Sequence, residues 1–422
     1  MGNINFAQLL QPVQCSCGKT HTCPIRHIEI GSGAIGKIGS IVENYHHILL
    51  VADQNTYAVC GEQVKQALGD RLEKVFVYQR EGILVPNERA AAEMEQQLTE
   101  QTDLIVGVGS GVIQDLCKYV SFTHKLPYDI VATAPSMDGY ASVGAAMIWN
   151  NMKVTFNCHT PQVIIGDVDI LKDAPMEMIR AGYGDILGKY SCLNDWKLSH
   201  IVNGEYFCQN VHDLMMDMVI KTRDLGEQLQ NREPAAIETL MEALAGAGVA
   251  MAMVGNSRPA SGSEHQMSHY FEITGLVHNT PYLMHGIDVV CSAVCTQKLR
   301  EALLQLQAVP ARRVFDRKTW EQEITRIYGT VAPGVIGLQD KLGWYQQDRY
   351  AIYAAKWDEI REVLSQTLSS KELEAYIRSV GLDMQDYIQI YGRQKICDGI
   401  AYAKDLKDRY SVLWMYYELM LL

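Results

Sequence analysis

Short apolar runs alternate with helical segments over the first 170 residues, and this alternation is the strongest constraint on the fold. The runs Ile48–Ala52, Leu104–Val106, Ile130–Ala132 and Val163–Ile165 have strand length and contain apolar residues only. Such runs are typical of parallel strands that are buried on both faces, with helices as the crossover connections. The pattern predicts a parallel sheet covered by helices on both sides, with ligands bound beyond the carboxyl ends of the strands.

From about residue 170 onward the chain changes to long helical segments. We expect Val168–Ile170 to be a last strand and residues 328–345, which contain Pro333 and Gly334, to interrupt the helices. A length of 422 residues favours two domains. The expected fold is an α/β N-terminal Rossmann-like parallel-sheet domain, residues 1–172, followed by an all-helical C-terminal domain, residues 173–422.

Composition argues against several classes of partner. The net charge is −12 and no run of lysine or arginine occurs, which argues against nucleic acid and against an anionic membrane surface. No stretch reaches the roughly 18 consecutive apolar residues of a spanning helix, and the N-terminal residues lack the pattern of a signal peptide. We therefore expect a cytoplasmic protein whose 11 cysteines are mostly reduced thiols.

An N-terminal arm contains Cys15, Cys17, His21 and Cys23 within nine residues. These side chains could bind zinc, although the paired C-x₂-C spacing of common zinc sites is absent. The alternative is a β-hairpin that turns at Gly18–Lys19, because glycine is favoured in tight turns. The sequence leaves both interpretations open.

A glycine turn follows the apolar run that ends at Val106. The segment Gly109-Ser110-Gly111 joins a predicted strand to a predicted helix. Glycines let the backbone approach a pyrophosphate closely, and the amides at a helix start favour an anion. We expect this turn to bind a nucleotide cofactor, with Asp53 and residues 133–136 at the ends of other strands.

Asp185, His265 and His285 form a potential metal cradle. One carboxylate and two imidazoles can hold a divalent cation and leave coordination positions open for a substrate oxygen. His269 lies four residues after His265, so the two share a face of a helix. Each histidine taken alone has an ordinary structural explanation, and the combination carries the hypothesis.

Five segments together resemble a known family. They are Val108-Gly-Ser-Gly111, Thr133-Ala-Pro-Ser-Met-Asp-Gly-Tyr-Ala-Ser142, Ala181-Gly-Tyr-Gly-Asp185, Ser257-Arg-Pro-Ala-Ser-Gly-Ser-Glu-His265 and His285-Gly286. In this order they resemble the sn-glycerol-1-phosphate dehydrogenases, bacterial branch, of the superfamily of iron-containing alcohol dehydrogenases, glycerol dehydrogenases and dehydroquinate synthases. The resemblance runs from about residue 25 to residue 300, so the cysteine arm and the last helices lie outside it.

The resemblance implies a role for each matching residue. Asp185, His265 and His285 would bind one divalent metal (zinc, nickel or iron), and Asp185 and His269 would be catalytic. Asp138, Asp185 and His269 would contact the substrate, and Arg258 is our candidate for its phosphate because a guanidinium suits bidentate contact. The residues expected to bind NAD or NADP are Asp53, Gly109, Ser110, Gly111, Val112, Ile113, Gln114, Asp115, Thr133, Ala134, Pro135, Ser136 and Ser142.

The implied activity is reversible reduction of dihydroxyacetone phosphate to sn-glycerol 1-phosphate by NAD(P)H, with the metal as Lewis acid. A small phosphorylated triose would be the substrate, and we expect a homo-oligomer, a dimer or larger. One alternative is a polyol dehydrogenase of the glycerol type, which needs no cation for a phosphate. Another is a cyclase like dehydroquinate synthase, a branch that usually has a glutamate where Asp185 stands.

Overall fold

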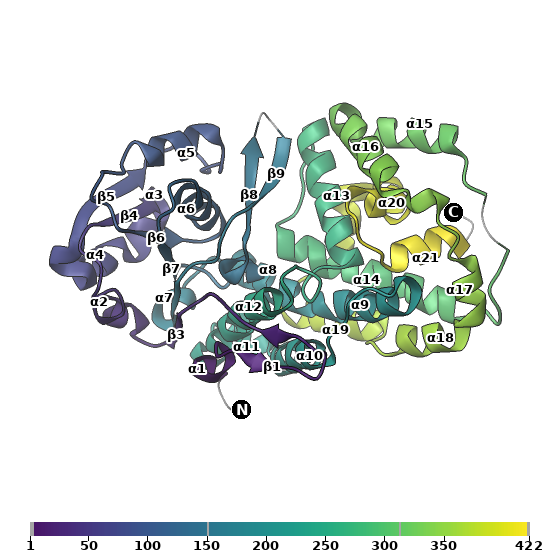
Figure 1. Ribbon diagram of the computed structural model, residues 1–422, viewed down its shortest axis with the longest axis horizontal. Helices are drawn as coiled ribbons and strands as arrows, with labels where there is room; N and C mark the ends of the chain where they lie inside the picture. The colour runs from purple at the N-terminus through teal and green to yellow at the C-terminus, as the bar shows by residue number, and fades with distance from the viewer. Residues whose placement is uncertain (1–3, 150–151, 312–313, 420–422) are drawn as a thin grey trace. The chain divides into compact units, whose positions relative to one another are not determined.

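The computed structural model describes residues 4–149, 152–311 and 314–419 (Figure 1). The chain forms two compact units. Unit 1 consists of Met1–Tyr183 and Glu227–Ser257, and unit 2 consists of Gly184–Gly226 and Arg258–Leu422.

A six-stranded sheet forms the centre of unit 1. Its strands are β3 (His27–Gly31), β4 (Ile48–Asp53), β5 (Leu72–Tyr78), β6 (Leu104–Gly109), β7 (Tyr128–Ala132) and β10 (Val163–Asp167). They lie in the order β3-β10-β7-β6-β4-β5, and every neighbouring pair is parallel. The connection from β4 leads to β5 at one edge, whereas β6 returns to the other side of β4. The strand order therefore switches direction between β4 and β6, where α/β folds usually bind ligands.

Helices cover both faces of this sheet, as the apolar runs predict. On one face, residues of η1 (Ala34–Lys37), α2 (Ile38–Ile41) and α4 (Glu62–Leu68) share a core with alternate strand residues such as Leu50 and Val106. On the other face, a Cβ atom on Gly107 would meet Cys117 of α6 (Gly111–Thr123). A Cβ atom on Gly166 would meet Met241 of α12 (Pro234–Val254).

The contacts of α12 with the sheet explain why unit 1 includes a late segment of the chain. The compact units therefore differ from the single boundary after residue 172 that the sequence suggests.

Among the described residues, α12 alone is long and apolar enough to cross a membrane by length and composition, and 72% of its apolar window is buried inside the protein. That burial is typical of the core helix of a globular unit.

The remaining elements of unit 1 are short. They are α1 (Phe6–Leu9), β1 (Val13–Gln14), β2 (Thr20–His21), α3 (Gln54–Thr56), η2 (Tyr57–Gly61), η3 (Gly69–Arg71), α5 (Glu88–Glu95), η4 (Asp138–Ala141), β8 (Gly144–Trp149), β9 (Met152–Asn157) and α7 (Val168–Leu171). The hairpin at Gly18–Lys19 is confirmed as β1–β2. The predicted strand Val168–Ile170 is wrong, because these residues form α7, whose first turn is capped by the Asp167 carboxylate.

Residues 184–226, 258–311 and 314–419 of unit 2 form helices joined by loops, with no strand among them. Its helices are α9 (Lys189–Asn203), α10 (Gln209–Arg223), α13 (Ser263–His278), α14 (His285–Leu304), α15 (Arg317–Tyr328), η5 (Gly329–Val331), α16 (Ala332–Leu342), η6 (Trp344–Gln346), α17 (Tyr350–Ala355), α18 (Trp357–Ser365), α19 (Ser370–Ser379), α20 (Met384–Tyr402), η7 (Ala403–Leu406) and α21 (Val412–Leu419). Helices α8 (Met176–Leu187) and α11 (Gly226–Gln230) contain residues of both units. The fold class is therefore confirmed as a parallel-sheet α/β region with an all-helical C-terminal region.

The expected interruption at residues 328–345 is wrong in its centre. Residues Ala332–Leu342 form α16, with Pro333 in the first turn. Proline is tolerated there because the amide it lacks has no partner inside the helix. Gly334 and Gly337 lie within the same helix.

Candidate active site

Three helices bring Asp185, His265 and His285 together, and all three residues belong to unit 2. Asp185 lies near the end of α8, His265 in the first turn of α13, and His285 is the first residue of α14. The potential ligand atoms of the three residues all lie within 4.8 Å of one another. The imidazole rings of His265 and His285 have centroids 5.1 Å apart.

Close packing of helix backbones sets this geometry. A Cβ atom on Gly184 would lie 2.3 Å from the carbonyl oxygen of Gly286, so only glycine allows α8 to pass the start of α14 this closely. The start of α13 is held by Asp195, whose carboxylate accepts from the Ser263 amide at 2.7 Å. Asp195 in turn forms a fully buried ion pair with Arg300 at 2.7 Å.

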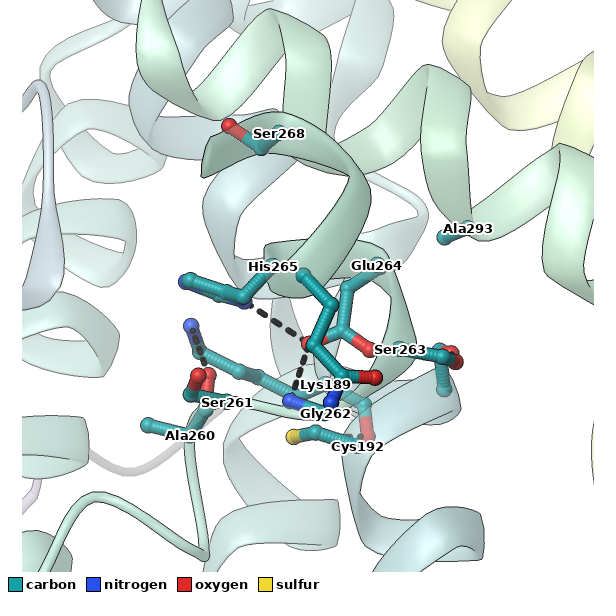
Figure 2. A network of polar contacts seen from close by, with 12 residues as sticks. Lys189, Cys192, Ala260, Ser261, Gly262, Ser263, Glu264, His265, Ser268 and Ala293 are labelled. Atoms are coloured by element: carbon teal, nitrogen blue, oxygen red, sulfur yellow. Dashed lines mark hydrogen bonds and ion pairs between the residues drawn. The ribbon is translucent and has the colours of Figure 1, made fainter. Parts of the chain in front are cut away.

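Each of the three side chains has a polar partner behind it. Lys189 Nζ donates to Asp185 Oδ1 at 2.7 Å and to the carbonyl oxygen of Ala260 at 3.1 Å. His265 Nδ1 lies 2.7 Å from Glu264 Oε1, which also accepts from the Gly262 amide (Figure 2). Ser268 Oγ lies 3.2 Å from His285 Nδ1. A proton on Nδ1 of either histidine would leave Nε2 for a metal, the usual role of such partners.

Burial and nearby charge set the ionisation of the cluster. Burial opposes ionisation of the Asp185 carboxyl, but the Lys189 cation holds its pKa well below the usual range. Burial and the Lys189 cation hold the pKa of His265 well below its usual value. Asp185 is therefore a carboxylate and His265 a neutral imidazole at neutral pH, which are the forms that bind metals.

These residues fit a divalent metal. The donor set of one carboxylate oxygen and two imidazole nitrogens suits zinc, nickel or iron and leaves positions open. His265 Nε2 already lies 3.6 Å from Asp185 Oδ1, close to the separation of two ligands on one metal. The predicted cradle is thus assembled from segments up to 100 residues apart, counted from Asp185 to His285.

His269 and Arg258 have different surroundings. The half-buried His269 lies beside the cradle, with its ring centroid 5.6 Å from that of His285. Arg258 is buried, and its Nε and Nη2 atoms donate to the carboxylate of Glu205, with Nη2 also donating to the carbonyl oxygen of Tyr410. These contacts engage the Nε and Nη2 donors of Arg258, and its role in binding the substrate phosphate stays a prediction.

In unit 1, the predicted cofactor turn joins β6 to α6. Gly109 ends β6, Ser110 is the N-cap residue, and Gly111 begins a helix of 13 residues. A Cβ atom on Gly109 would lie 2.6 Å from Cβ of Ile113, so glycine is required there. The turn lies beside Asp53, which ends the neighbouring strand β4. This is the strand–turn–helix arrangement in which helix amides bind a phosphate.

The predicted cofactor residues after β7 lie next to this turn. Ser110 Oγ and Ser136 Oγ are 2.7 Å apart, and the Thr133 amide donates to the carbonyl oxygen of Gly109. Ser142 Oγ accepts from Lys118 Nζ at 3.3 Å. The same loop contains two more predicted cofactor residues, Ala134 and Pro135. It also contains Asp138, the predicted substrate contact, at the start of η4.

Some predicted cofactor residues also have partners within the protein. The Gln114 side chain is fully buried and donates to the hydroxyl of Tyr128 and the carbonyl oxygen of Tyr140. Ile113 is buried as well, whereas Val112 and Asp115 are partly exposed at the start of α6. The Asp53 carboxylate accepts from the amides of Asn55 and Thr56, where it caps α3.

Residue-by-residue reasoning missed the partners of the site residues. Lys189 follows Asp185 by four positions, and side chains at that spacing meet on a helix. The sequence could therefore have predicted the contact between Lys189 and Asp185. Glu264 and Ser268 flank the histidine segment, but nothing in the sequence shows which ring nitrogen they contact. Lys118 is buried and donates to the carbonyl oxygens of Gly139 and Gly144, which follows from loop geometry alone.

The family model of iron-containing alcohol dehydrogenases matches residues 29–175. The chain is 34% identical over 283 residues to the glycerol-1-phosphate dehydrogenase [NAD(P)+] of Halalkalibacterium halodurans, covering 65% of this chain and 71% of that protein. It is 27% identical to the enzyme of the same name from Bacillus licheniformis, covering 94% of this chain and 90% of that protein. The fold is similar to that of glycerol dehydrogenase from Schizosaccharomyces pombe, with a TM-score of 0.54 at 16% identity over 92% of this chain and 93% of that one. The five motifs, the fold and these similarities lead to one conclusion: the chain belongs to the glycerol-1-phosphate dehydrogenase family, within the iron-containing alcohol dehydrogenase superfamily.

Proposed function

We propose that this chain is an NAD(P)- and metal-dependent oxidoreductase that interconverts dihydroxyacetone phosphate and sn-glycerol 1-phosphate. One observation carries the proposal. A chain 34% identical to a named glycerol-1-phosphate dehydrogenase assembles a complete cradle of Asp185, His265 and His285. The cradle could hold the Lewis acid that assists reduction of a ketone. The name of the relatives indicates which ketone is the substrate.

The proposed roles follow from the surroundings of each residue. A bound divalent metal would polarise the C2 carbonyl as a Lewis acid, and the nicotinamide would supply the hydride. Asp185, His265 and His285 hold the metal, while Lys189 and Glu264 fix the orientation of Asp185 and His265. Reduction also needs one proton at the C2 oxygen, and His269 is the imidazole beside the cradle that could donate it.

In unit 1 we propose that the β6–α6 turn binds the cofactor pyrophosphate through the amides after Ser110. Asp53, at the end of β4, would accept from a ribose hydroxyl and would repel a 2′-phosphate, which favours NAD. Asp138 is a proposed substrate contact. Arg258 stays the sequence-based candidate for the substrate phosphate, although its Nε and Nη2 atoms donate to Glu205 and Tyr410.

The deciding experiment measures oxidation of NADH and NADPH after reconstitution with Zn²⁺, Ni²⁺ or Fe²⁺. Dihydroxyacetone phosphate should exceed dihydroxyacetone in kcat/KM by about 100-fold, ~2.7 kcal/mol, because a remote phosphate provides binding energy for the reaction at C2. Equal activity on both ketones would favour the polyol dehydrogenase. Release of inorganic phosphate from a cyclisation substrate would favour the cyclase.

The stereochemistry of the product is a separate test. The product should not be oxidised by a coupling enzyme specific for sn-glycerol 3-phosphate. Oxidation by that enzyme would contradict the proposed stereochemistry even if the substrate is correct.

Size-exclusion chromatography with light scattering would test the homo-oligomer that we expect from the resemblance.

A further inference from the structure

The N-terminal hairpin of unit 1 contains a cluster of metal-binding side chains that the proposed reaction does not use. Its strands β1 and β2 have only two residues each, with Val13 opposite His21. The turn is closed by Cys15 and Lys19, whose backbones are hydrogen-bonded at 3.0 Å, and Gly18 adopts a φ of +86°. So short a hairpin is marginal by itself and needs further contacts to hold its shape.

Two thiols and one imidazole converge inside this hairpin. The donor atoms of Cys15, Cys17 and His21 all lie within 4.8 Å of one another. Cys17 Sγ lies 3.5 Å from His21 Nε2. With Zn–S bonds of about 2.3 Å and Zn–N bonds of about 2.0 Å, a sulfur and a nitrogen at a tetrahedral angle are about 3.5 Å apart. The observed separation therefore fits two ligands of one metal.

His21 is oriented as a metal ligand would be. Its ring is buried, with 2% of its surface exposed, although most residues of the hairpin are exposed. Its Nδ1 atom lies 2.7 Å from the carbonyl oxygen of Met253, in the last turn of α12. That carbonyl accepts a hydrogen bond from the Nδ1–H group, which leaves Nε2 with its lone pair directed towards the thiol of Cys17. In zinc sites, the histidine nitrogen that does not bind the metal commonly donates to a backbone carbonyl in this way.

We propose that Cys15, Cys17 and His21 form a structural site for zinc, or for a similar thiophilic divalent ion, separate from the Asp185 cradle. Thiolate and imidazole ligands select zinc over hard cations such as magnesium and calcium. The fourth position is taken by a further thiol or by water. Through His21 and Met253, the metal links the hairpin to the C-terminal end of α12 and so completes this part of unit 1.

The test uses cobalt as a spectroscopic substitute for zinc in the full-length, metal-free, reduced protein. Thiolates bound to Co²⁺ give charge-transfer absorption in the near ultraviolet, whereas the ligands Asp185, His265 and His285 contain no sulfur. The unsubstituted protein and the Asp185→Ala variant should both show this absorption. Cys15→Ser and Cys17→Ser should each lose a large part of it. The double variant should lose nearly all of it, because His21 and at most one further thiol no longer form a site.

Cys23→Ser is the matched control, because Cys23 follows the same hairpin but is not part of the cluster. It should keep the full cobalt absorption. The proposal is overturned if the unsubstituted protein shows no thiolate absorption, if the Cys15→Ser, Cys17→Ser double variant keeps it, or if Cys23→Ser loses it equally.

A second measurement needs no substitution in the hairpin and covers variants that fail to fold. In the zinc-loaded Asp185→Ala protein, a chelator should increase the number of thiols that react with a thiol reagent and should lower the melting temperature. Unchanged thiol reactivity after removal of all zinc would contradict the proposed ligands.

Discussion

At the scale of single residues, the proposed metal cradle has buried ionisable residues beside it that are not among its expected ligands. Glu264 and Lys189 are fully buried, each beside one of the expected ligands. A buried charge is costly unless it is paired, so such residues are retained where they orient a functional group. Their removal should affect the site more strongly than their distance from the substrate suggests.

Glu264→Ala removes the acceptor behind His265 Nδ1 and frees the ring to rotate and to change tautomer. We expect metal affinity to fall about 10- to 100-fold, the usual effect of losing such a partner. Glu264→Gln keeps an oxygen acceptor and should recover part of the affinity. Metal titration of the stripped proteins measures both, and an unchanged affinity in Glu264→Ala would show that the contact does not position His265.

Asp129 on β7 should make stability depend on pH. It is 1% exposed, and burial raises its pKa from 3.8 to about 7, against smaller effects of Arg26 and the Val163 backbone. The folded state therefore holds this proton more tightly than the unfolded chain. The resulting stability is fully present below about pH 4 and is lost as the pH rises through about 7.

Asp129→Asn should remove this dependence. Relative to the unsubstituted protein, the variant should gain up to about 4 kcal/mol at pH 8, from ~1.4 kcal/mol for each pKa unit, and gain little at pH 4. Thermal unfolding at both pH values measures the difference. Asp70→Asn, at an exposed position, is the control, and an Asp129→Asn gain that is equal at both pH values would contradict the prediction.

At the scale of elements, glycines determine how closely the helices of the site approach. A Cβ atom on Gly184 would lie 2.3 Å from the Gly286 carbonyl oxygen and 3.0 Å from Val290 Cγ1. Gly184→Ala must therefore move α8 away from α14 by roughly 1 Å, which separates Asp185 from His285 beyond the tolerance of a metal site.

We expect Gly184→Ala to bind metal at least about tenfold more weakly, ~1.4 kcal/mol, although it changes no ligand. Gly337→Ala on α16 is the matched control, because its Cβ atom meets open space in the same unit. Metal titration and circular dichroism distinguish a local displacement from unfolding. Equal metal affinity in the two variants would mean that the helix approach does not set the cradle.

Strands with a continuous apolar run were predictable from the sequence. Elements whose state depends on a cap or on tertiary packing were not. Continuous apolar runs gave β4, β6, β7 and β10 because burial on both faces leaves little choice of residue. The same reasoning mistook Val168–Ile170 for a strand, since three apolar-rich residues fit either state and the Asp167 cap decides for a helix. The hairpin β8–β9 was missed because its residues lack a clear alternation.

The candidate site was predictable in its ligand types but not in its supporting contacts. Asp185, His265 and His285 are unusual in combination, so the resemblance located them in the sequence. The donors of Arg258 could not be assigned in that way, because Glu205 and Tyr410 are distant in sequence and only the fold brings them to the guanidinium. Pairing of a buried arginine is a tertiary property, which local patterns do not encode.

At the scale of the whole molecule, the proposed cofactor turn and the metal cradle belong to different compact units, each with its own buried core. The turn Gly109–Gly111 lies in unit 1, and all three expected metal ligands lie in unit 2. Loss of one site should therefore leave the other able to bind its ligand, although both are needed for turnover.

Two variants test this independence in opposite directions. Asp185→Ala should lose the catalytic metal and all activity while NADH still binds with nearly its original affinity. Gly111→Val adds bulk where the backbone would approach a phosphate, so NADH binding should weaken more than about tenfold, ~1.4 kcal/mol, while the cradle keeps its metal. Fluorescence titration with NADH and elemental analysis give the two readouts on each variant. If Asp185→Ala abolished NADH binding, or Gly111→Val emptied the cradle, the two sites would depend on each other for assembly, and the division of labour between the units would be wrong.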